Sequence, residues 1–306
     1  MISYVKLLRP INLLLIVLIQ CLIKYGLLES WQVQTQLSTI QFVILVIITL
    51  LIAGAGNVVN DIFDEAVDRI NKPDKMIVWR LLSEKKAYNY YIVLNIMGVG
   101  LGFYLANSIG HPGLTAVFIG ISALLYIYAT HVKAMLLVGN LLVSLLVAMS
   151  LMVMILFDIY PTIDLEVTPL QVKASKVILF YAGFAFFMNL IREIVKDLQD
   201  IDGDKNGGRN SLPIVLGRTR ATNLVFAMGA ITFLGILYIT YLKLYTYTWL
   251  SFYFVFLIAA PLLIFCIKAW NAETKKDYAG LSVLLKIIML LGVCSLPLFA
   301  KSFLPV

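Results

Sequence analysis

The chain has 306 residues, of which 61% are hydrophobic and 13% are charged, and its mean hydropathy is +0.93. A typical soluble domain carries about 25% charged residues, so this composition excludes an ordinary soluble protein and indicates an integral membrane protein. The net charge of +7 comes from basic residues at the ends of apolar runs, so we expect contact with a membrane surface and no nucleic-acid partner. Cys21, Cys266 and Cys294 lie far apart in apolar runs and have the spacing of neither a disulfide framework nor a zinc site.

Apolar runs long enough to cross a bilayer recur along the whole chain. A spanning helix needs about 20 mostly apolar residues. The expected spans lie near 11–28, 40–59, 88–108, 114–130, 134–157, 174–195, 222–242, 247–267 and 283–300. No small-residue cleavage site follows the first run, so we expect it to remain as a helix. The sequence predicts one all-α, integral, multi-pass membrane domain over 1–306, with its longest connections at about 60–87 and 196–221.

Lysine and arginine are distributed unevenly between the two sides of these spans. With the N-terminus placed inside, 19 of them fall on the cytoplasmic side and 5 on the outer side. Because basic residues favour the cytoplasmic side, this bias predicts the N-terminus inside and the C-terminus outside. Both long connections then face the cytoplasm, and the cell membrane is the expected location.

The first long connection begins with an acidic cluster, Asn60-Asp61-Ile62-Phe63-Asp64-Glu65-Ala66-Val67-Asp68. On a helix, the i, i+4, i+8 spacing of Asn60, Asp64 and Asp68 puts them within about 80° of one another. Carboxylates beside hydrocarbon are costly and are therefore functional candidates. Oxygen ligands of this kind suit magnesium, so Asn60, Asp61, Asp64 and Asp68 are candidate metal ligands. The cations that follow, Arg69 and Lys72, either contact phosphate oxygens or anchor the helix end at the membrane surface.

A second acidic cluster, Asp197-Leu198-Gln199-Asp200-Ile201-Asp202-Gly203-Asp204, opens the other long connection. If the segment is helical, Asp197, Asp200 and Asp204 share one face within about 60° and are further metal-ligand candidates, whereas Asp202 is expected to face solvent. Arg192 and Lys196 precede them by about one helical turn each and could reach the same ligand. Two carboxylate sets at one membrane depth are what a protein needs to hold divalent cations around a diphosphate.

These motifs together resemble the UbiA superfamily of intramembrane prenyltransferases. The run Asn60-Asp61-x-x-Asp64-x-x-x-Asp68 resembles its first aspartate-rich motif, and Asp200-x-x-x-Asp204 resembles its second. Leu8-Arg9-Pro10-x-Asn12 is similar to the family's first-helix entry, and Tyr128 with Lys133 is similar to a stretch between its fourth and fifth spans. Nine spans with two cytosolic motif connections also fit, so the likeness covers nearly the whole chain.

The resemblance implies nine helices around a central cavity that opens to the cytoplasm, and magnesium-dependent transfer of a prenyl group from an allylic diphosphate. It implies that Asp64, Asp68, Asp200 and Asp204 carry the reaction. The residues expected to bind substrate are Asn12, Arg69, Lys72, Tyr128, Lys133, Arg192, Lys196 and Arg209. The expected partners are the diphosphate, an acceptor and the bilayer, with no obligate protein partner.

The run from Arg192 to Gly217 is most similar to the superfamily members that add geranylgeranyl groups to prenylated glyceryl phosphates. Met76, Trp79 and Asn210 depart from the family pattern, and all three lie near the acceptor side. An aromatic acceptor, such as a quinone precursor, is therefore the alternative. A glyceryl phosphate needs an extra cationic pocket, whereas an aromatic acid needs one arginine and a stacking surface. A transporter is a remote alternative, because it would require charges at mid-membrane and the outer halves of the spans carry few.

Overall fold

The computed structural model describes residues 2–163 and 167–304, so the two ends of the predicted 1–306 domain fall outside it. Within this range, nine helical segments are long and apolar enough to cross a membrane, which confirms the predicted number. They span Pro10–Leu28, Thr39–Phe63, Glu84–Ser108, Pro112–Thr130, Val138–Thr162, Pro169–Gln199, Arg218–Leu244, Thr248–Trp270 and Lys275–Ser302. Most extend a few residues beyond the predicted ends, because polar residues at the helix ends continue the helix past the apolar core.

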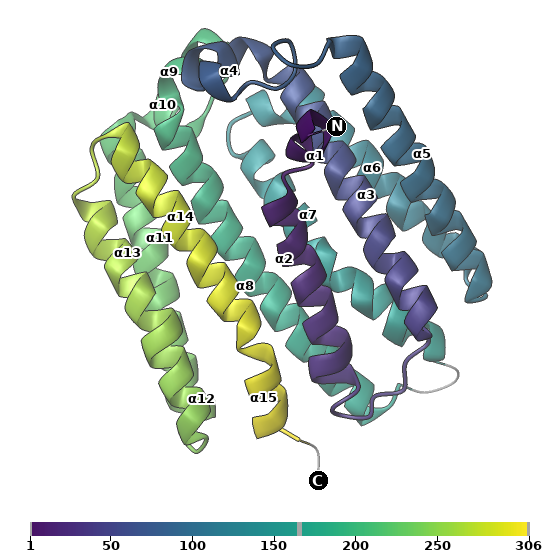
Figure 1. Ribbon diagram of the computed structural model, residues 1–306. Helices are drawn as coiled ribbons and strands as arrows, with labels where there is room; N and C mark the ends of the chain where they lie inside the picture. Colours follow the sequence, from purple (N-terminus) through teal and green to yellow (C-terminus); the bar gives the residue numbers. More distant parts are fainter. Residues whose placement is uncertain (1, 164–166, 305–306) are drawn as a thin grey trace.

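The helices run side by side as one bundle (Figure 1). The α-helices of its spans are α2 (Pro10–Cys21), α3 (Thr39–Phe63), α5 (Glu84–Ser108), α6 (Thr115–Thr130), α7 (Val138–Met154), α8 (Pro169–Gln199), α11 (Arg218–Ile239), α12 (Thr248–Tyr253), α13 (Ala260–Trp270), α14 (Lys275–Cys294) and α15 (Leu296–Ser302). Turns of π-helix complete several spans at η1 (Leu22–Leu28), η5 (Ile155–Ile159), η7 (Thr240–Leu244) and η8 (Phe254–Ala259). The described residues form no sheet, and their only β-type pairing is an isolated bridge between Val78 and Leu82.

Three of the long helices begin at a reciprocal capping box. Ser38 starts α3, Thr168 starts α8 and Thr274 starts α14. In each, the hydroxyl accepts a hydrogen bond from the third helical residue, whose side chain accepts one from the cap's backbone N–H. This exchange satisfies donors that a helix start otherwise leaves unpaired. The local sequence thereby fixes where α3 and α8 begin, and these are the two helices that end at the acidic motifs.

Helix α8 joins two apolar cores. The first core lies among α2, α3, α7 and the N-terminal half of α8, and the second lies among the C-terminal half of α8, α11, α13 and α14. Close contact between helices depends on glycine at a few points: a Cβ on Gly292 would approach the Phe184 ring to 2.6 Å, so α14 rests directly on α8. Many large apolar side chains elsewhere face outward, as expected for a surface solvated by lipid.

The two long connections are more helical than the sequence suggested. The first contains α4 (Glu65–Asn71) and the 3-10 turn η2 (Pro73–Lys75), and the second contains α9 (Ile201–Asn206) and α10 (Leu212–Leu216). These short helices lie together at the end of the bundle that also carries α1 (Ile2–Leu7) and the N-terminus (Figure 1). Both acidic motifs are therefore held on helices at the same end of the bundle.

An ion pair is buried at the other end of the bundle, where the sequence predicted few charges. Lys24 in η1 and Asp158 in η5 are only 4% and 0% exposed at their side chains. The ammonium donates to both Asp158 oxygens, at 3.2 and 2.9 Å, and also to the Leu37 carbonyl and the Thr35 hydroxyl. Asp158 Oδ1 accepts from the Leu37 N–H at 2.8 Å. Because the pair is enclosed and fully hydrogen-bonded, it is a structural contact, and the arrangement does not favour ion passage.

Candidate active site

Each aspartate motif has its central residue at a junction between a long and a short helix. Asp64 lies between α3 and α4, with φ −89° and ψ 3°, and Asp200 lies between α8 and α9, with φ −109° and ψ 15°. The i to i+4 backbone bonds continue through both junctions, from Asp68 N to Asp64 O and from Asp204 N to Asp200 O. Each motif therefore bends at its junction and keeps its helical spacing, so the predicted shared faces are largely preserved.

Asn71 clamps the two motifs together. Its side chain donates to the Asp200 carbonyl at 3.0 Å and accepts from the Gly203 N–H at 3.2 Å. Lys275 at the start of α14 donates to the Asn71 carbonyl at 3.1 Å. A Cβ on Gly203 would overlap the Asn71 side chain, so only glycine allows this contact. The clamp fixes the distance between motifs that are separated by 128 or more positions along the chain.

We expect Gly203→Ala to damage both stability and activity. The added methyl group would push Asn71 out of its bonds to α9, and overpacking of this kind costs about 1–3 kcal/mol. A lower unfolding temperature in detergent, together with reduced prenyl transfer, would confirm the role of the clamp. Gly120→Ala is the matched control, because a Cβ there meets nothing within 4 Å and alanine favours a helix. If the two variants have the same unfolding temperature and the same rate of prenyl transfer, the role given to Asn71 is contradicted.

Asp64 is held by cations from two other parts of the chain. Lys133, in the 3-10 turn η4 (Val132–Ala134), donates to its Oδ1 at 2.8 Å, and Arg209 pairs with the same carboxylate. Asn60 donates to Asp64 Oδ2 at 2.5 Å. Burial alone would raise the pKa of Asp64, but Lys133 and Arg209 together hold it below its ordinary value. The carboxylate therefore stays ionised and ready to bind a cation.

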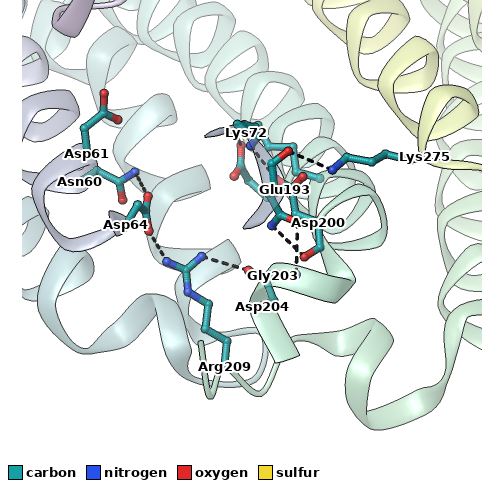
Figure 2. A network of polar contacts seen from close by, with 12 residues as sticks. Asn60, Asp61, Asp64, Lys72, Glu193, Asp200, Gly203, Asp204, Arg209 and Lys275 are labelled. Carbon is teal, nitrogen blue, oxygen red and sulfur yellow. Dashed lines mark hydrogen bonds and ion pairs between the residues drawn. The ribbon is translucent and has the colours of Figure 1, made fainter. Parts of the chain in front are cut away.

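Arg209 bridges the two motifs. Figure 2 shows its guanidinium between Asp64 and Asp204, and Nη1 donates to Asp204 Oδ1 at 3.1 Å. The neighbouring Asn210 N–H donates to the Ala134 carbonyl at 3.1 Å, which ties this loop to the turn that carries Lys133. Asn210, which departs from the family pattern, therefore contributes its backbone to the site.

The remaining members of the second motif have partners of their own. Lys72 donates to Asp200 Oδ2 at 2.6 Å, while Asp200 Oδ1 is buried and finds no hydrogen-bond partner within the described part of the chain. Asn140, on α7, donates to Asp197 Oδ2 at 2.8 Å. Burial raises the pKa of Asp204 to about 6 in spite of Arg209. It also raises the pKa of Asp68 to about 6, and the charge of Asp64 adds to this rise.

These features suit divalent cations. The carboxylates Asp64, Asp68, Asp197, Asp200 and Asp204 lie with three cations, Lys72, Lys133 and Arg209, so this group has a formal net charge of −2. In residues 2–163 and 167–304, no three acidic, histidine or cysteine side chains gather around a single point that could hold an ion. Magnesium commonly binds one or two carboxylates and takes its other ligands from water and substrate phosphate. An orphan carboxylate oxygen and raised acidic pKa values fit that mode.

Other predicted residues lie beside this cluster or away from it. Asp61 pairs with Arg9 at 2.5 Å. Arg69 pairs with Glu65 and is 65% exposed, so the structure does not bring it into the cluster. Tyr128 lies within electrostatic range of Asp64 and Asp197. The metal and substrate roles of these residues and the central cavity remain predictions.

A second group of charged residues adjoins the first. Arg192 and Lys196 both donate to Glu193, at 3.2 and 2.6 Å, and Lys286 on α14 donates to Asn12 Oδ1 at 2.8 Å. Arg192, Lys196 and Asn12 were predicted from the sequence as substrate-binding residues, whereas Lys286, Asn71 and Asn140 were not. A lone lysine inside an apolar span was the available signal for Lys286, because such charges are rare and usually have a use.

Trp79 occupies a backbone conformation that suits glycine. Its φ is 74°, and its N–H donates to the Leu82 carbonyl at 2.8 Å in the turn after η2. Trp79 is one of the residues that depart from the pattern of the resembled family, and it adopts a left-handed backbone conformation. Such a conformation costs about 1–3 kcal/mol for a residue with a side chain. The turn is therefore strained and is held in place by its neighbours.

The family model for UbiA prenyltransferases matches residues 15–290. This chain belongs to the UbiA prenyltransferase family. Its relatives include the digeranylgeranylglyceryl phosphate synthase of Methanosphaera stadtmanae, which is 29% identical over 95% of this chain and 97% of the relative. The enzyme of that name from Methanococcoides burtonii is 32% identical over 96% and 98%.

A solved structure shares the fold. The UbiA homologue from Archaeoglobus fulgidus, bound to DMAPP and Mg²⁺, superposes with a TM-score of 0.54 at 17% identity, covering 96% of this chain and 99% of that one. Family membership and fold together establish a multi-pass membrane prenyltransferase. This confirms the resemblance predicted from the motifs and excludes the transporter alternative.

Proposed function

We propose that this UbiA-family enzyme transfers a geranylgeranyl group from its diphosphate to the free hydroxyl of a prenylated glyceryl phosphate, forming an ether. The observation that carries the proposal is the pair of clamped aspartate motifs with surplus negative charge, beside a separate group with surplus positive charge. Two relatives that match nearly the whole chain are named for this activity, and an A. fulgidus homologue binds an allylic diphosphate with Mg²⁺.

The residues of the cluster suit ionisation of the donor. Asp64, Asp68, Asp200 and Asp204 would hold magnesium on the diphosphate. The metal supplies stabilisation of the charge that develops there as the C1–O bond breaks. Lys72, Lys133 and Arg209, which now pair with these carboxylates, are placed to turn to phosphate oxygens. Tyr128 offers an aromatic face beside the resulting allylic cation.

The second step needs no strong base. The electron pair of the broken bond leaves with the diphosphate, and the glyceryl hydroxyl oxygen forms the new bond to C1. Its proton becomes acidic as this bond forms and passes to an oxygen of the released diphosphate. Because the allylic cation is a strong electrophile, the hydroxyl can attack it without a histidine acting as general base. The excess of basic residues at this end of the bundle supports placing the reaction on the cytoplasmic side.

Magnesium dependence tests this proposal. Purified protein supplied with geranylgeranyl diphosphate and a prenylated glyceryl phosphate should form the ether product with Mg²⁺, lose turnover in excess chelator, and recover when Mg²⁺ is restored. The reason is that the carboxylates repel a diphosphate unless cations lie between them. Full activity in excess chelator would refute the mechanism.

A further inference from the structure

A cationic cluster, made of Arg9 before α2, Arg192 and Lys196 on α8 and Lys286 on α14, adjoins the aspartate motifs. Arg192 and Lys196 on α8 share a single carboxylate, Glu193, and the Arg192 Nε atom is buried without a hydrogen-bond partner among the described residues. Lys286, on α14, reaches across to the Asn12 carbonyl oxygen on α2 at 2.8 Å. Lysine and arginine here have donors to spare, because a neutral amide and one shared carboxylate leave most of their N–H groups uncommitted.

The side chains of the cationic cluster lie within electrostatic range of one another. Arg192 and Arg9 both lie close enough to Lys286 to act electrostatically on it, and Arg9 does the same to Arg192 and Lys196. Four cations, Arg9, Arg192, Lys196 and Lys286, lie with the carboxylates of Asp61 and Glu193, so this group has a formal net charge of +2. A phosphate monoester carries a charge of about −1.5 to −2 at pH 7, which matches this surplus.

The cationic cluster borders the first aspartate motif. Arg9 also acts on Asp61, Asp64 and Asp68, so it lies on the border between the cationic cluster and the first motif. In a prenylated glyceryl phosphate, the free hydroxyl and the phosphate sit on adjacent carbons. A phosphate bound by the cationic cluster would therefore leave the acceptor hydroxyl close to the donor's diphosphate.

We propose that Lys286 and Arg192, with Asn12 orienting the lysine, form the binding site for the phosphate of the glyceryl phosphate acceptor, separate from the site of the donor diphosphate. This rests on the proposed function and deepens it. An aromatic acid carries a single charge and would leave part of the surplus unmatched. In this proposal the cationic cluster binds the acceptor through the charge of its phosphate, and the aspartate motifs bind the donor diphosphate.

The test is Lys286→Met, which keeps an unbranched side chain of similar length and removes its charge. The KM for the prenylated glyceryl phosphate should rise at least about tenfold, since a charge-assisted hydrogen bond to phosphate is lost. The KM for geranylgeranyl diphosphate should stay within about twofold. Lys286→Arg should recover most of the loss. Lys276→Met, which removes an exposed charge from the same helix, is the matched control and should change neither constant.

A second arm separates the phosphate from the rest of the acceptor. Binding of the prenylated glyceryl phosphate and of its phosphate-free alcohol is measured without Mg²⁺ in the wild-type protein and in Lys286→Met. The variant should weaken binding of the phosphate and leave the alcohol unchanged. An unchanged acceptor KM, an equal loss for both ligands, or a rise in the donor KM instead would overturn the assignment while leaving the proposed function intact. If the wild-type protein neither binds nor prenylates glyceryl phosphates, the proposed function and the phosphate-site assignment are both wrong.

Discussion

Asp64→Asn is expected to lower kcat by at least about a hundredfold while the protein remains folded. Asp64 is the carboxylate on which the first motif, Lys133 and Arg209 converge. Asparagine keeps the shape but loses the charge that would hold magnesium, and it leaves two cations facing a neutral group. Steady-state kinetics at saturating Mg²⁺, with the unfolding temperature measured in parallel, is the check.

Asp202→Asn is the control for this variant. Asp202 lies in the second motif but is exposed, and its backbone carbonyl, not its carboxylate, accepts a bond from Asn206. Its loss should leave kcat nearly unchanged. An active Asp64→Asn beside an inactive Asp202→Asn would show that the assigned motif positions are wrong.

Lys24→Met is expected to destabilise the protein by about 3–5 kcal/mol, without any direct effect on the site. The substitution leaves the Asp158 carboxylate buried with no cation, and backbone N–H groups such as that of Leu37 are left to stabilise its charge. Thermal unfolding in detergent should show a large drop in the midpoint. Any residual folded protein should keep its KM values.

The double variant Lys24→Met, Asp158→Leu separates charge from packing. Replacing both partners removes the buried charge, so most of the lost stability should return. Lys243→Met removes an exposed charge from another span and should be nearly neutral. If Lys24→Met and Lys243→Met unfold at the same temperature, the buried pair contributes little to stability.

The helix count and the two motifs could be predicted because they are local patterns. Runs of apolar residues fix the nine spans, and the i, i+4 spacing of Asp64 with Asp68 and of Asp200 with Asp204 survives in the structure. The bends at Asp64 and Asp200 were not visible, since nothing in their neighbours interrupts a helical pattern. The helical spacing of the motif residues was predicted, but their division into the separate short helices α4 and α9 was not.

Contacts between distant residues could not be predicted from one sequence. The Asn71 clamp, the Lys24–Asp158 pair and the Lys286–Asn12 bond each join residues more than 100 positions apart. Each contains a signal that is visible in the sequence: a polar residue after the motif, or a charge inside a span. The sequence does not show which residue each of them contacts, because that depends on which helices lie side by side in the fold. Asp158 shows the limit most clearly, since its partner lies in a different span.

The most direct measurement is a competition for the acceptor. Purified protein receives geranylgeranyl diphosphate and Mg²⁺ with a prenylated glyceryl phosphate and a hydroxynaphthoate at equal concentration, and the products are separated by mass. Because the cationic cluster has a formal net charge of +2, we expect the ether of the glyceryl phosphate to be the main product. If the naphthoate is prenylated and the glyceryl phosphate is ignored, the acceptor assignment is wrong, while the aspartate motifs would still account for the donor.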